Sequence, residues 1–393
     1  MPSHFCERAI NDALSHGNAL LKFISPNDVG MTGSHQCGFY LPKLAWKLFS
    51  PHRPVKGENK DSFVDILWQN GSVTHSRVIW YGSKTRSEYR LTRFGKDFPY
   101  LTDDNVGDLL VITVINKSRF LGYVLFNEED IEEIFSSLGV SPKGTWGIYS
   151  KEIQEPPIDE ESCISSLFLD YARRLVNFPS TSEFSKHTWD TLHTCIRDFD
   201  KENQDDRLMR LIDEEYKCFK IAERLISGPD VQRLFKDIDD FLETAAKIMN
   251  RRKARAGRSF ENHMQYILED ASIPHEMRPQ RIDGYPDIVM PSQQKYFDSS
   301  WPDDKLIIVG LKTTCKDRWR QVLNEGKRIK TKHLITLQPG MSVNQLNEMK
   351  DSNVVLIAPK TLHKKYPKNS KMKIQSLESF LENTIKKIGK IDG

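Results

Sequence analysis

The second half of the chain alternates short apolar runs with amphipathic ones, and this alternation restricts its fold more than any other feature. The run KLIIVGLK is almost continuously apolar, which is typical of a strand covered on both faces of a sheet. The predicted strands are 286–290, 305–312, 333–337 and 353–359, and the predicted helices between them are 315–328 and 343–350. A helix between the last two strands is the signature of a βαβ unit. The pattern predicts an α/β domain.

The first half of the chain shows short β-rich runs instead, at 62–68, 76–82, 108–115 and 119–126. Asn70-Gly71 separates the first two runs and is a strong hairpin signal. Short strands joined by tight turns predict a barrel or sandwich with few helices, one of them near 6–22. A chain of 393 residues is expected to form two or three domains.

An acidic stretch with paired prolines, Pro156 and Pro157, separates the halves and is typical of an exposed linker. After it, apolar residues at helical spacing predict three helices. They are 203–226, which should stop at Ser227-Gly228-Pro229, then 229–249 and 259–270. We therefore predict a domain at 1–155, a linker at 156–174 and a second domain at 175–393.

The compartment is predicted from cysteines and from the lack of targeting signals. The cysteines at 6, 37, 163, 195, 218 and 315 lack the spacing of a zinc ribbon or a thioredoxin-type pair. Scattered thiols of this kind fit a reducing cytosol. The N-terminus does not resemble a signal peptide, and no run approaches the roughly 20 apolar residues of a membrane span. These features predict a cytoplasmic protein with no membrane partner.

Three residues in the second half match the needs of phosphodiester hydrolysis. Asp287 opens a predicted strand, Lys312 ends the next, and Glu325 lies on the following predicted helix. A divalent ion such as Mg²⁺ takes carboxylate oxygens and activates water, and a lysine can position that water. Many nucleases carry the second carboxylate two residues before the lysine, but that position is Gly310 here. Glu325 is the natural replacement, and Glu261 could supply another carboxylate.

Taken singly, each of these residues is more often a solvated surface charge, so the spacing alone is a weak nuclease signal. Two basic runs strengthen it, although such runs are usually solvated faces. NRRKARAGR, at 250–258, carries five basic residues, and seven more lie between 316 and 332. Basic runs that flank a carboxylate–lysine site would neutralise phosphates.

The triplet Lys316, Asp317 and Arg318 offers a donor, an acceptor and a donor in succession. Lys and Arg donate to guanine, and a carboxylate accepts from cytosine, so the triplet could read adjacent G·C pairs. The alternative is an ordinary helix start with an Asp near the helix dipole.

Segments along nearly the whole chain resemble the EcoRII type of restriction endonuclease. They are SPNDVGMTGSHQCGFYLP, SKTRSEYRLTRFG, NRRKARAGRSFE, PDIVMP, VGLKTTCKDRWRQVLNE and LHKKYP. The resemblance implies a mixed fold, with an N-terminal barrel-like DNA-binding pseudobarrel and a C-terminal α/β domain of the restriction-endonuclease, PD-(D/E)XK, class. It implies cleavage of both strands of double-stranded DNA at a site of the CC(A/T)GG kind.

The resemblance also assigns residues. The catalytic set is Glu261, Asp287, Lys312 and Glu325, with Asp287 and Glu325 as Mg²⁺ ligands, and Lys316, Asp317 and Arg318 read the G·C pairs. In the N-terminal domain, which binds a second site as effector and autoinhibits cleavage, the implied DNA contacts are His35, Tyr40, Lys84, Arg86, Glu88, Tyr89 and Arg90.

Tyr216 matches the aromatic residue that stacks on flipped central bases in related enzymes. The family arginine expected four residues earlier is Ile212 here, unless the helix register shifts to Arg210. This departure leaves the central-base preference open.

Cutting two strands of a palindromic-type site needs two active sites, so we expect a homodimer. A cognate cytosine methyltransferase is the expected functional partner. One alternative is a modification-dependent nuclease whose N-terminal domain reads methylated cytosine. Another is a DNA-binding regulator with an inactive nuclease domain, which the intact catalytic set disfavours.

Overall fold

The computed structural model describes residues 2–32, 37–49, 55–82, 88–140, 145–152, 162–316 and 318–389. The chain forms two compact units. The N-terminal unit comprises Met1–Glu155, Gln338–Glu348 and Leu362–Lys371, and the C-terminal unit comprises Pro156–Leu337, Met349–Thr361 and Met372–Gly393. The first unit therefore includes two segments from late in the chain, and inside it the Gln338 amide donates to the Gly107 carbonyl at 3.1 Å.

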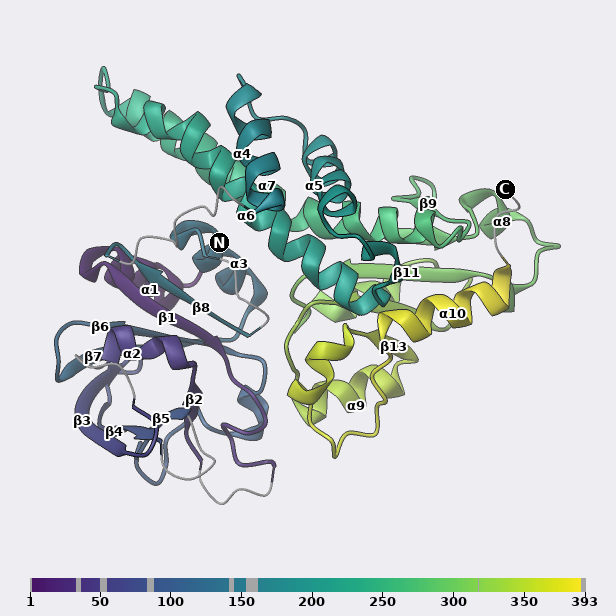
Figure 1. The fold of residues 1–393 in the computed structure, drawn as a ribbon. Helices are drawn as coiled ribbons and strands as arrows, with labels where there is room; N and C mark the ends of the chain where they lie inside the picture. The colour runs from purple at the N-terminus through teal and green to yellow at the C-terminus, as the bar shows by residue number, and fades with distance from the viewer. Residues whose placement is uncertain are drawn as a thin grey trace. The chain divides into compact units, whose positions relative to one another are not determined.

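The N-terminal unit is built on one curled sheet (Figure 1). Its strands are β1 (Asn18–Phe23), β2 (Phe39–Leu41), β3 (Asn59–Trp68), β4 (Val73–Tyr81), β5 (Glu88–Thr92), β6 (Leu109–Val114), β7 (Arg119–Leu125) and β8 (Trp146–Ser150). The strand order is β2-β5-β4-β3-β7-β6-β1-β8, and β3 and β7 are its parallel pair within the described residues. Its helices are α1 (His4–His16), α2 (Trp46–Phe49) and α3 (Glu128–Leu138), with 3-10 turns η1 (Lys43–Ala45) and η2 (Asp103–Asn105).

Alternate side chains of this sheet enter two separate cores, as the period of two along a strand requires. Leu20 packs into the cluster around Trp68, whereas Leu21 packs with α1 and α3 on the opposite face. The predicted hairpin is confirmed, since Gly71 adopts a φ of +84° between β3 and β4. The helix predicted near 6–22 ends earlier than predicted, at His16. Gly17 caps it in the left-handed conformation, and β1 begins at Asn18.

The C-terminal unit contains a five-stranded mixed sheet of order β13-β12-β11-β10-β9 among the described residues. Its strands are β9 (Glu276–Met277), β10 (Ile288–Met290), β11 (Ile307–Lys312), β12 (Lys332–Thr336) and β13 (Val354–Ile357). The last three are parallel, and β10 is antiparallel to both its neighbours. Helix α9 (Val343–Asp351) connects β12 to β13, which confirms the predicted βαβ unit. Strand β11 is buried from Ile307 to Leu311, as its apolar run predicts.

The helices of this unit cover the sheet and extend beyond it (Figure 1). They are α4 (Cys163–Arg174), α5 (Thr181–Cys195), α6 (Gln204–Gln232), α7 (Ile238–Asp270), α8 (Gln293–Phe297) and α10 (Leu377–Ile388), with 3-10 turns η3 (Phe199–Lys201), η4 (Asp303–Lys305) and η5 (Arg318–Asn324). A further 3-10 turn, η6 (Lys360–Lys365), begins in this unit and belongs to the N-terminal unit from Leu362 onward. Phe260 and Met264 of α7 join Leu211 of α6 and Ile288 and Val309 of the sheet in the main core.

Two predicted helix boundaries were wrong. Helix α6 continues through Gly228 and Pro229 to Gln232, so these residues do not stop it. Residues 238–249 of the second predicted helix and all of the third, 259–270, belong to one helix, α7, whereas 229–232 end α6. Pro229 lacks an N–H and so removes one hydrogen bond from the last turn of α6, and the Arg233 N–H donates to the Pro229 carbonyl at 3.1 Å.

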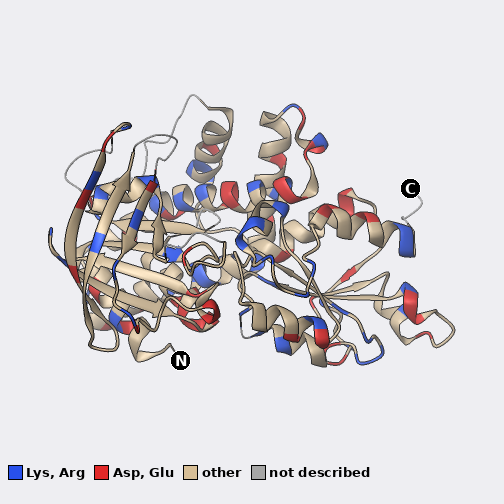
Figure 2. Cartoon of the chain, turned by 90° about the horizontal axis from the view of Figure 1, so that it is seen from below, with Lys and Arg blue, Asp and Glu red and all other residues tan. Residues whose placement is uncertain are grey.

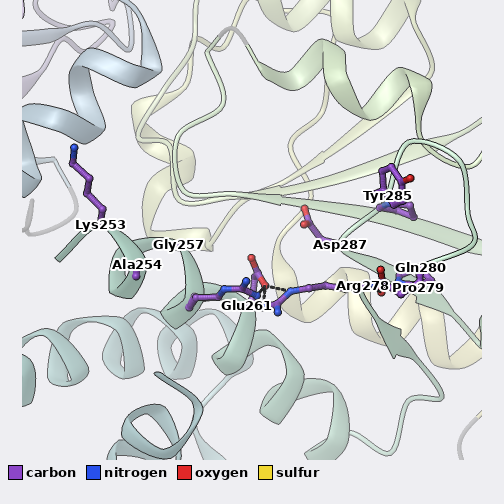
Figure 3. Close-up of a pocket in the computed structure, with 11 residues that line it drawn as sticks. Lys253, Ala254, Gly257, Glu261, Arg278, Pro279, Gln280, Tyr285 and Asp287 are labelled. Atoms are coloured by element: carbon purple, nitrogen blue, oxygen red, sulfur yellow. Dashed lines mark hydrogen bonds and ion pairs between the residues drawn. The ribbon is translucent and has the colours of Figure 1, made fainter. Parts of the chain in front are cut away.

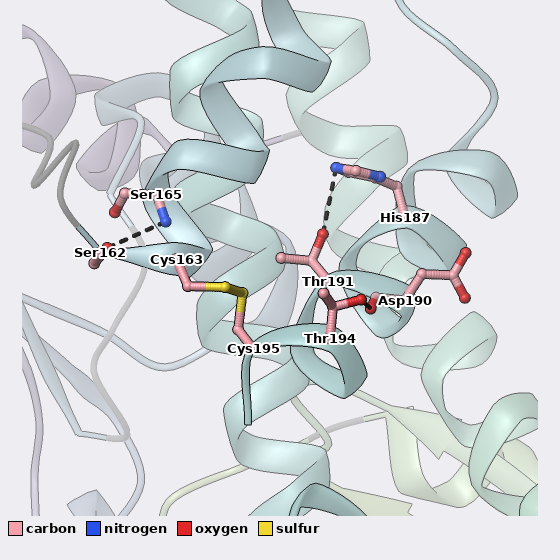
Figure 4. Close-up of a disulfide and its surroundings, with 8 residues drawn as sticks. All are labelled: Ser162, Cys163, Ser165, His187, Asp190, Thr191, Thr194 and Cys195. Carbon is pink, nitrogen blue, oxygen red and sulfur yellow. Dashed lines mark hydrogen bonds between the residues drawn. A yellow bond between two sulfur atoms is a disulfide. The ribbon is translucent and has the colours of Figure 1, made fainter. Parts of the chain in front are cut away.

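The predicted linker at 156–174 contains helix α4 from Cys163 onward. Cys163 at the start of α4 and Cys195 at the end of α5 form a disulfide (Figure 4). The expectation of scattered, unpaired thiols therefore needs correction for these two cysteines, because the α4–α5 hairpin brings together residues 32 positions apart. Cys6, Cys37, Cys218 and Cys315 take part in no disulfide.

Acidic and basic side chains are interspersed over both units (Figure 2). This distribution fits the small net charge of +3. Local clusters of charge therefore matter more here than the overall charge. Within the part of the chain that is described, no helix is both long enough and apolar enough to cross a membrane.

Candidate catalytic centre

Asp287 and Lys312 meet at one edge of the C-terminal sheet. Asp287 immediately precedes β10, and Lys312 ends the antiparallel strand β11. The Asp287 Oδ2 atom accepts a hydrogen bond from the Leu311 N–H at 2.7 Å and from the Lys312 Nζ at 3.2 Å. Both side chains are about one-fifth exposed, at 19% and 21%. The pair is thus fixed by the backbone yet open to a ligand.

Glu325 completes this group from a different element than expected. The segment predicted as an α-helix at 315–328 is the 3-10 turn η5, and Glu325 is the first residue after it. A Cβ atom at Gly310 would lie 2.7 Å from Val322 Cγ1 and 3.6 Å from Glu325 Oε2. The glycine therefore leaves the space into which the displaced carboxylate reaches.

The electrostatics of Glu325 suit a cation site. Its side chain is buried, at 4% exposure, and its Oε2 atom has no hydrogen-bond partner among the described residues. Burial and the neighbouring Asp287 carboxylate raise the pKa of Glu325 to about 7, against the opposing influence of Lys312. A buried, unpartnered carboxylate beside a second carboxylate is stabilised when a cation binds both.

The described residues contain no cluster of three or more His, Cys, Asp or Glu side chains arranged to hold a metal ion. Within this group, Asp287 and Glu325 offer two carboxylates to a metal ion. Mg²⁺ is usually held by one or two carboxylates together with water and substrate phosphate. The donor set present fits a hard divalent ion of that type.

Glu261, on α7, faces the same region across a cavity of about 460 Å³ (Figure 3). Arg278 Nε donates to Glu261 Oε2 at 2.5 Å, and Arg258 lies 3.6 Å from the same oxygen. Burial and then Asp287 raise the pKa of Glu261, whereas Arg258 lowers it. No motif in the sequence marks Arg278, because Arg278 lies 17 residues from Glu261 on another element.

Two members of the predicted base-reading triplet are described, Lys316 after β11 and Arg318 at the start of η5. Lys316 is buried, with 6% exposure, and Arg318 is the partly buried first residue of η5. Asp317 falls outside the described residues. The described segment that follows, Arg318–Asn324, is a 3-10 turn.

Tyr216 is half-buried on α6, and the Arg255 guanidinium lies 5.1 Å from the centre of its ring. Ile212 packs against the main core, and Arg210 forms an ion pair with Glu202 at 3.0 Å. Arg210 therefore does not replace the arginine that the family pattern places near this tyrosine. Tyr216 nevertheless has a cation beside it, Arg255 of α7. The sequence does not reveal this contact, because it depends on how α6 and α7 pack.

Several residues of the basic runs have structural partners, which corrects their interpretation as phosphate contacts. The Arg251 guanidinium stacks over Phe178 and Arg252 pairs with Glu223, so both join α7 to its neighbours. The buried Lys332 donates to the carbonyls of Gly326 and Ile329. Arg328 in turn donates to the carbonyl groups of Lys295, Tyr296, Asp298 and Trp301.

The N-terminal candidates lie on β2 and β5. The Tyr40 hydroxyl donates to Glu88 at 2.6 Å, and the Arg90 guanidinium lies 5.5 Å from the Tyr40 ring. Arg90 is only 7% exposed, and Tyr89 packs in the core against Trp80. Their predicted contact with DNA stays a prediction. His35, Lys84 and Arg86 fall outside the described residues.

Comparison with known proteins identifies the class and then the family. Residues 14–152 match the family described as restriction endonuclease EcoRII, N-terminal, and residues 219–381 match EcoRII C terminal. The chain is therefore a type II restriction endonuclease, a site-specific deoxyribonuclease, as predicted. The type II restriction enzyme EcoRII of Escherichia coli is 31% identical over 384 residues, which cover 92% of each chain. This chain belongs to the EcoRII family.

Other similar proteins match less of the chain. The type II restriction enzyme SsoII of Shigella sonnei is 26% identical over 146 residues, or 34% of this chain and 46% of that one. Metal-depleted Ecl18kI in complex with uncleaved, modified DNA has a TM-score of 0.46 at 21% identity, covering 56% of this chain and 83% of that one. A PspGI–substrate DNA complex has a TM-score of 0.43 at 12% identity, covering 54% and 93%.

Proposed function

We propose that this enzyme hydrolyses both strands of double-stranded DNA at a site of the CC(A/T)GG kind, with Mg²⁺ as cofactor. The observation that carries the proposal is the group of Asp287, Lys312 and Glu325, in which Gly310 makes room for the displaced carboxylate. Membership of the EcoRII family supports the substrate class. DNA is the expected partner, in the cytoplasm of a prokaryote, with a cognate cytosine methyltransferase protecting the host sites.

Each residue of the centre has a distinct role in this proposal. Asp287 and Glu325 would hold the divalent ion, which would supply an activated water and polarise the phosphate. A cation bound by both carboxylates would favour the ionised form of Glu325, against the burial and the Asp287 charge that raise its pKa. Lys312, held by Asp287, donates to the attacking water or to the phosphate oxygens. Glu261 supports the group from α7.

Specificity is assigned to two further groups. Lys316, Asp317 and Arg318 read the G·C pairs in the major groove. Tyr216 stacks on a flipped central base, and Arg255 holds the ring and supplies positive charge beside it. Because Arg255 reaches Tyr216 from α7, the discrimination between A·T and G·C at the centre can differ from that of family members with an arginine on α6.

The enzyme is proposed to act as a homodimer, since two strands require two active sites. The tip of the hairpin formed by α6 and α7 exposes Leu225, Val231, Leu234, Ile238, Phe241 and Leu242. An apolar surface of this extent is typical of a protein–protein contact. A second copy of the chain is its proposed occupant.

The N-terminal unit is proposed to be a DNA-binding pseudobarrel that binds a second copy of the site as effector and otherwise blocks cleavage. The match of residues 14–152 to the EcoRII N-terminal family supports this role. The alternative is a modification-dependent nuclease in which this unit reads methylated cytosine.

One experiment separates these proposals. Phage DNA is incubated with the protein and Mg²⁺, with plain and with cytosine-methylated DNA, and the fragment ends are sequenced. We expect cuts at one short G·C-flanked site in plain DNA, and none with a chelator. Cleavage of methylated DNA alone would favour the modification-dependent alternative, and absence of cuts in either DNA would contradict the proposed function.

A further inference from the structure

The cavity beside Asp287 is lined by cations as well as by the catalytic carboxylates. It measures about 460 Å³, and its lining includes Lys253 and Arg258 of α7 and Arg278 of the loop after β9. The described structure thus places three basic side chains and two acidic ones around one opening. A cavity of this composition suits an anion that can displace a carboxylate from its cationic partners.

Arg278 has an unusual and well-fixed position in this cavity. Its φ of +48° lies in the left-handed region, which a residue with a side chain seldom adopts. Its N–H donates to the Asp287 carbonyl at 2.8 Å, so its backbone is tied directly to the catalytic aspartate. The side chain is still 42% exposed, and it can therefore change its partner without leaving the cavity wall.

In the structure without DNA, the partner of Arg278 is Glu261. The guanidinium donates twice to a single carboxylate oxygen, from Nε and from Nη2, and Arg258 stands 3.6 Å from that oxygen. A phosphodiester offers the same planar fork two acceptor oxygens and a full negative charge. Glu261 thus occupies the position that a phosphate group would take.

We propose that this cavity is a phosphate subsite for the DNA backbone next to the scissile bond, in which Arg278 exchanges Glu261 for a phosphate. The exchange frees the Glu261 carboxylate as DNA enters, so that the group near Asp287 is assembled only on the substrate. This inference rests on the proposed function, and it adds a contact that the catalytic and base-reading residues do not supply.

The test measures DNA binding in a chelator, without cleavage, over a series of salt concentrations. Arg278→Gly removes the side chain, and glycine adopts the left-handed backbone without strain. We expect it to weaken binding roughly tenfold for site-containing and random duplexes alike, and to reduce the slope of log affinity against log salt by about 1. Arg278→Lys should restore most of the slope.

A second variant separates phosphate binding from a purely structural pair. Glu261→Gln removes the competing charge, so it should strengthen DNA binding, and the gain should disappear when combined with Arg278→Gly. Arg281→Ala is the matched control, because Arg281 is an exposed arginine of the same loop outside the cavity lining. An unchanged slope for Arg278→Gly, with wild-type binding intact, would overturn the subsite. Failure of the wild-type chain to bind any duplex would instead contradict the proposed function itself.

Discussion

At the scale of single residues, the centre depends on a carboxylate that reaches the site from outside the sheet. If Glu325 and Asp287 together hold the metal ion, Glu325→Gln should reduce cleavage by several orders of magnitude and leave specific DNA binding intact. Lys312→Ala should behave alike. The measurement is single-turnover cleavage beside binding in a chelator, with Glu382→Gln on the exposed face of α10 as control. A variant that cuts at near wild-type rate under saturating Mg²⁺ would remove Glu325 from the centre.

The raised pKa of Glu325 also affects stability. A carboxylate whose pKa rises from 4.5 to about 7 on folding binds its proton more tightly in the folded state, so stability decreases as pH rises through this interval. Without divalent metal, Glu325→Gln should therefore raise the free energy of unfolding at about pH 8 by up to about 3 kcal/mol. The difference should vanish near pH 4, where both side chains are neutral. Urea unfolding at the two pH values measures it, and a variant that is less stable at the higher pH contradicts the stated direction.

Arg318 tests whether the triplet reads bases or phosphates. Arg318→Ala should lose about 1–3 kcal/mol of discrimination at one G·C pair. Binding to random DNA should change little, because no phosphate contact is removed. Competition binding with single-substituted duplexes gives the discrimination at each position. An equal loss on specific and random DNA would identify Arg318 as a phosphate contact.

At the scale of elements, Gly310 on β11 and the turn η5 fit together closely. Gly310→Ala places a Cβ atom 2.7 Å from Val322 Cγ1, so we expect a loss of about 1–3 kcal/mol in stability and a displaced Glu325 with reduced cleavage. Adding Val322→Ala should recover much of the stability. Gly228→Ala on α6, where a Cβ meets nothing within 4 Å, is the control. Wild-type stability and cleavage for Gly310→Ala would show that the space is not needed.

The strands of the site could be predicted from sequence because their signals are local. An apolar run, a terminal lysine and an aspartate after proline place Asp287 and Lys312 at strand ends, and the pairing of β10 with β11 brings them together. Because Gly310 has no side chain, Glu325 was the natural candidate for the second carboxylate, although the 3-10 turn that precedes Glu325 was predicted as part of an α-helix.

Contacts between distant elements could not be predicted in this way. Arg278 reaches Glu261 from a loop, and Arg255 reaches Tyr216 from a neighbouring helix. Gly228 and Pro229 signalled a helix end, but α6 continues to Gln232. The first two contacts depend on tertiary packing, which local sequence preference does not report.

At the scale of the whole molecule, the division into units determines which experiments are sound. The N-terminal unit includes Gln338–Glu348 and Leu362–Lys371, so removing residues 1–155 would leave these segments without the residues they pack against. A truncated enzyme that starts near residue 170 would also cut through α4 and lose Cys163. The full-length chain is therefore the proper subject for testing control by the N-terminal unit.

The central claim is that the C-terminal unit carries the hydrolytic centre and that the N-terminal unit controls it. Effector DNA can shift such control only if the blocked state is favoured by a few kcal/mol. The most direct measurement is the cleavage rate of a plasmid with one site, with and without an oligonucleotide that carries a second site. We predict slow cutting alone, strong stimulation by the oligonucleotide, and loss of that stimulation in Arg86→Ala with its catalytic residues intact. Fast cutting of the one-site plasmid by the full-length chain, with no stimulation, would contradict the account.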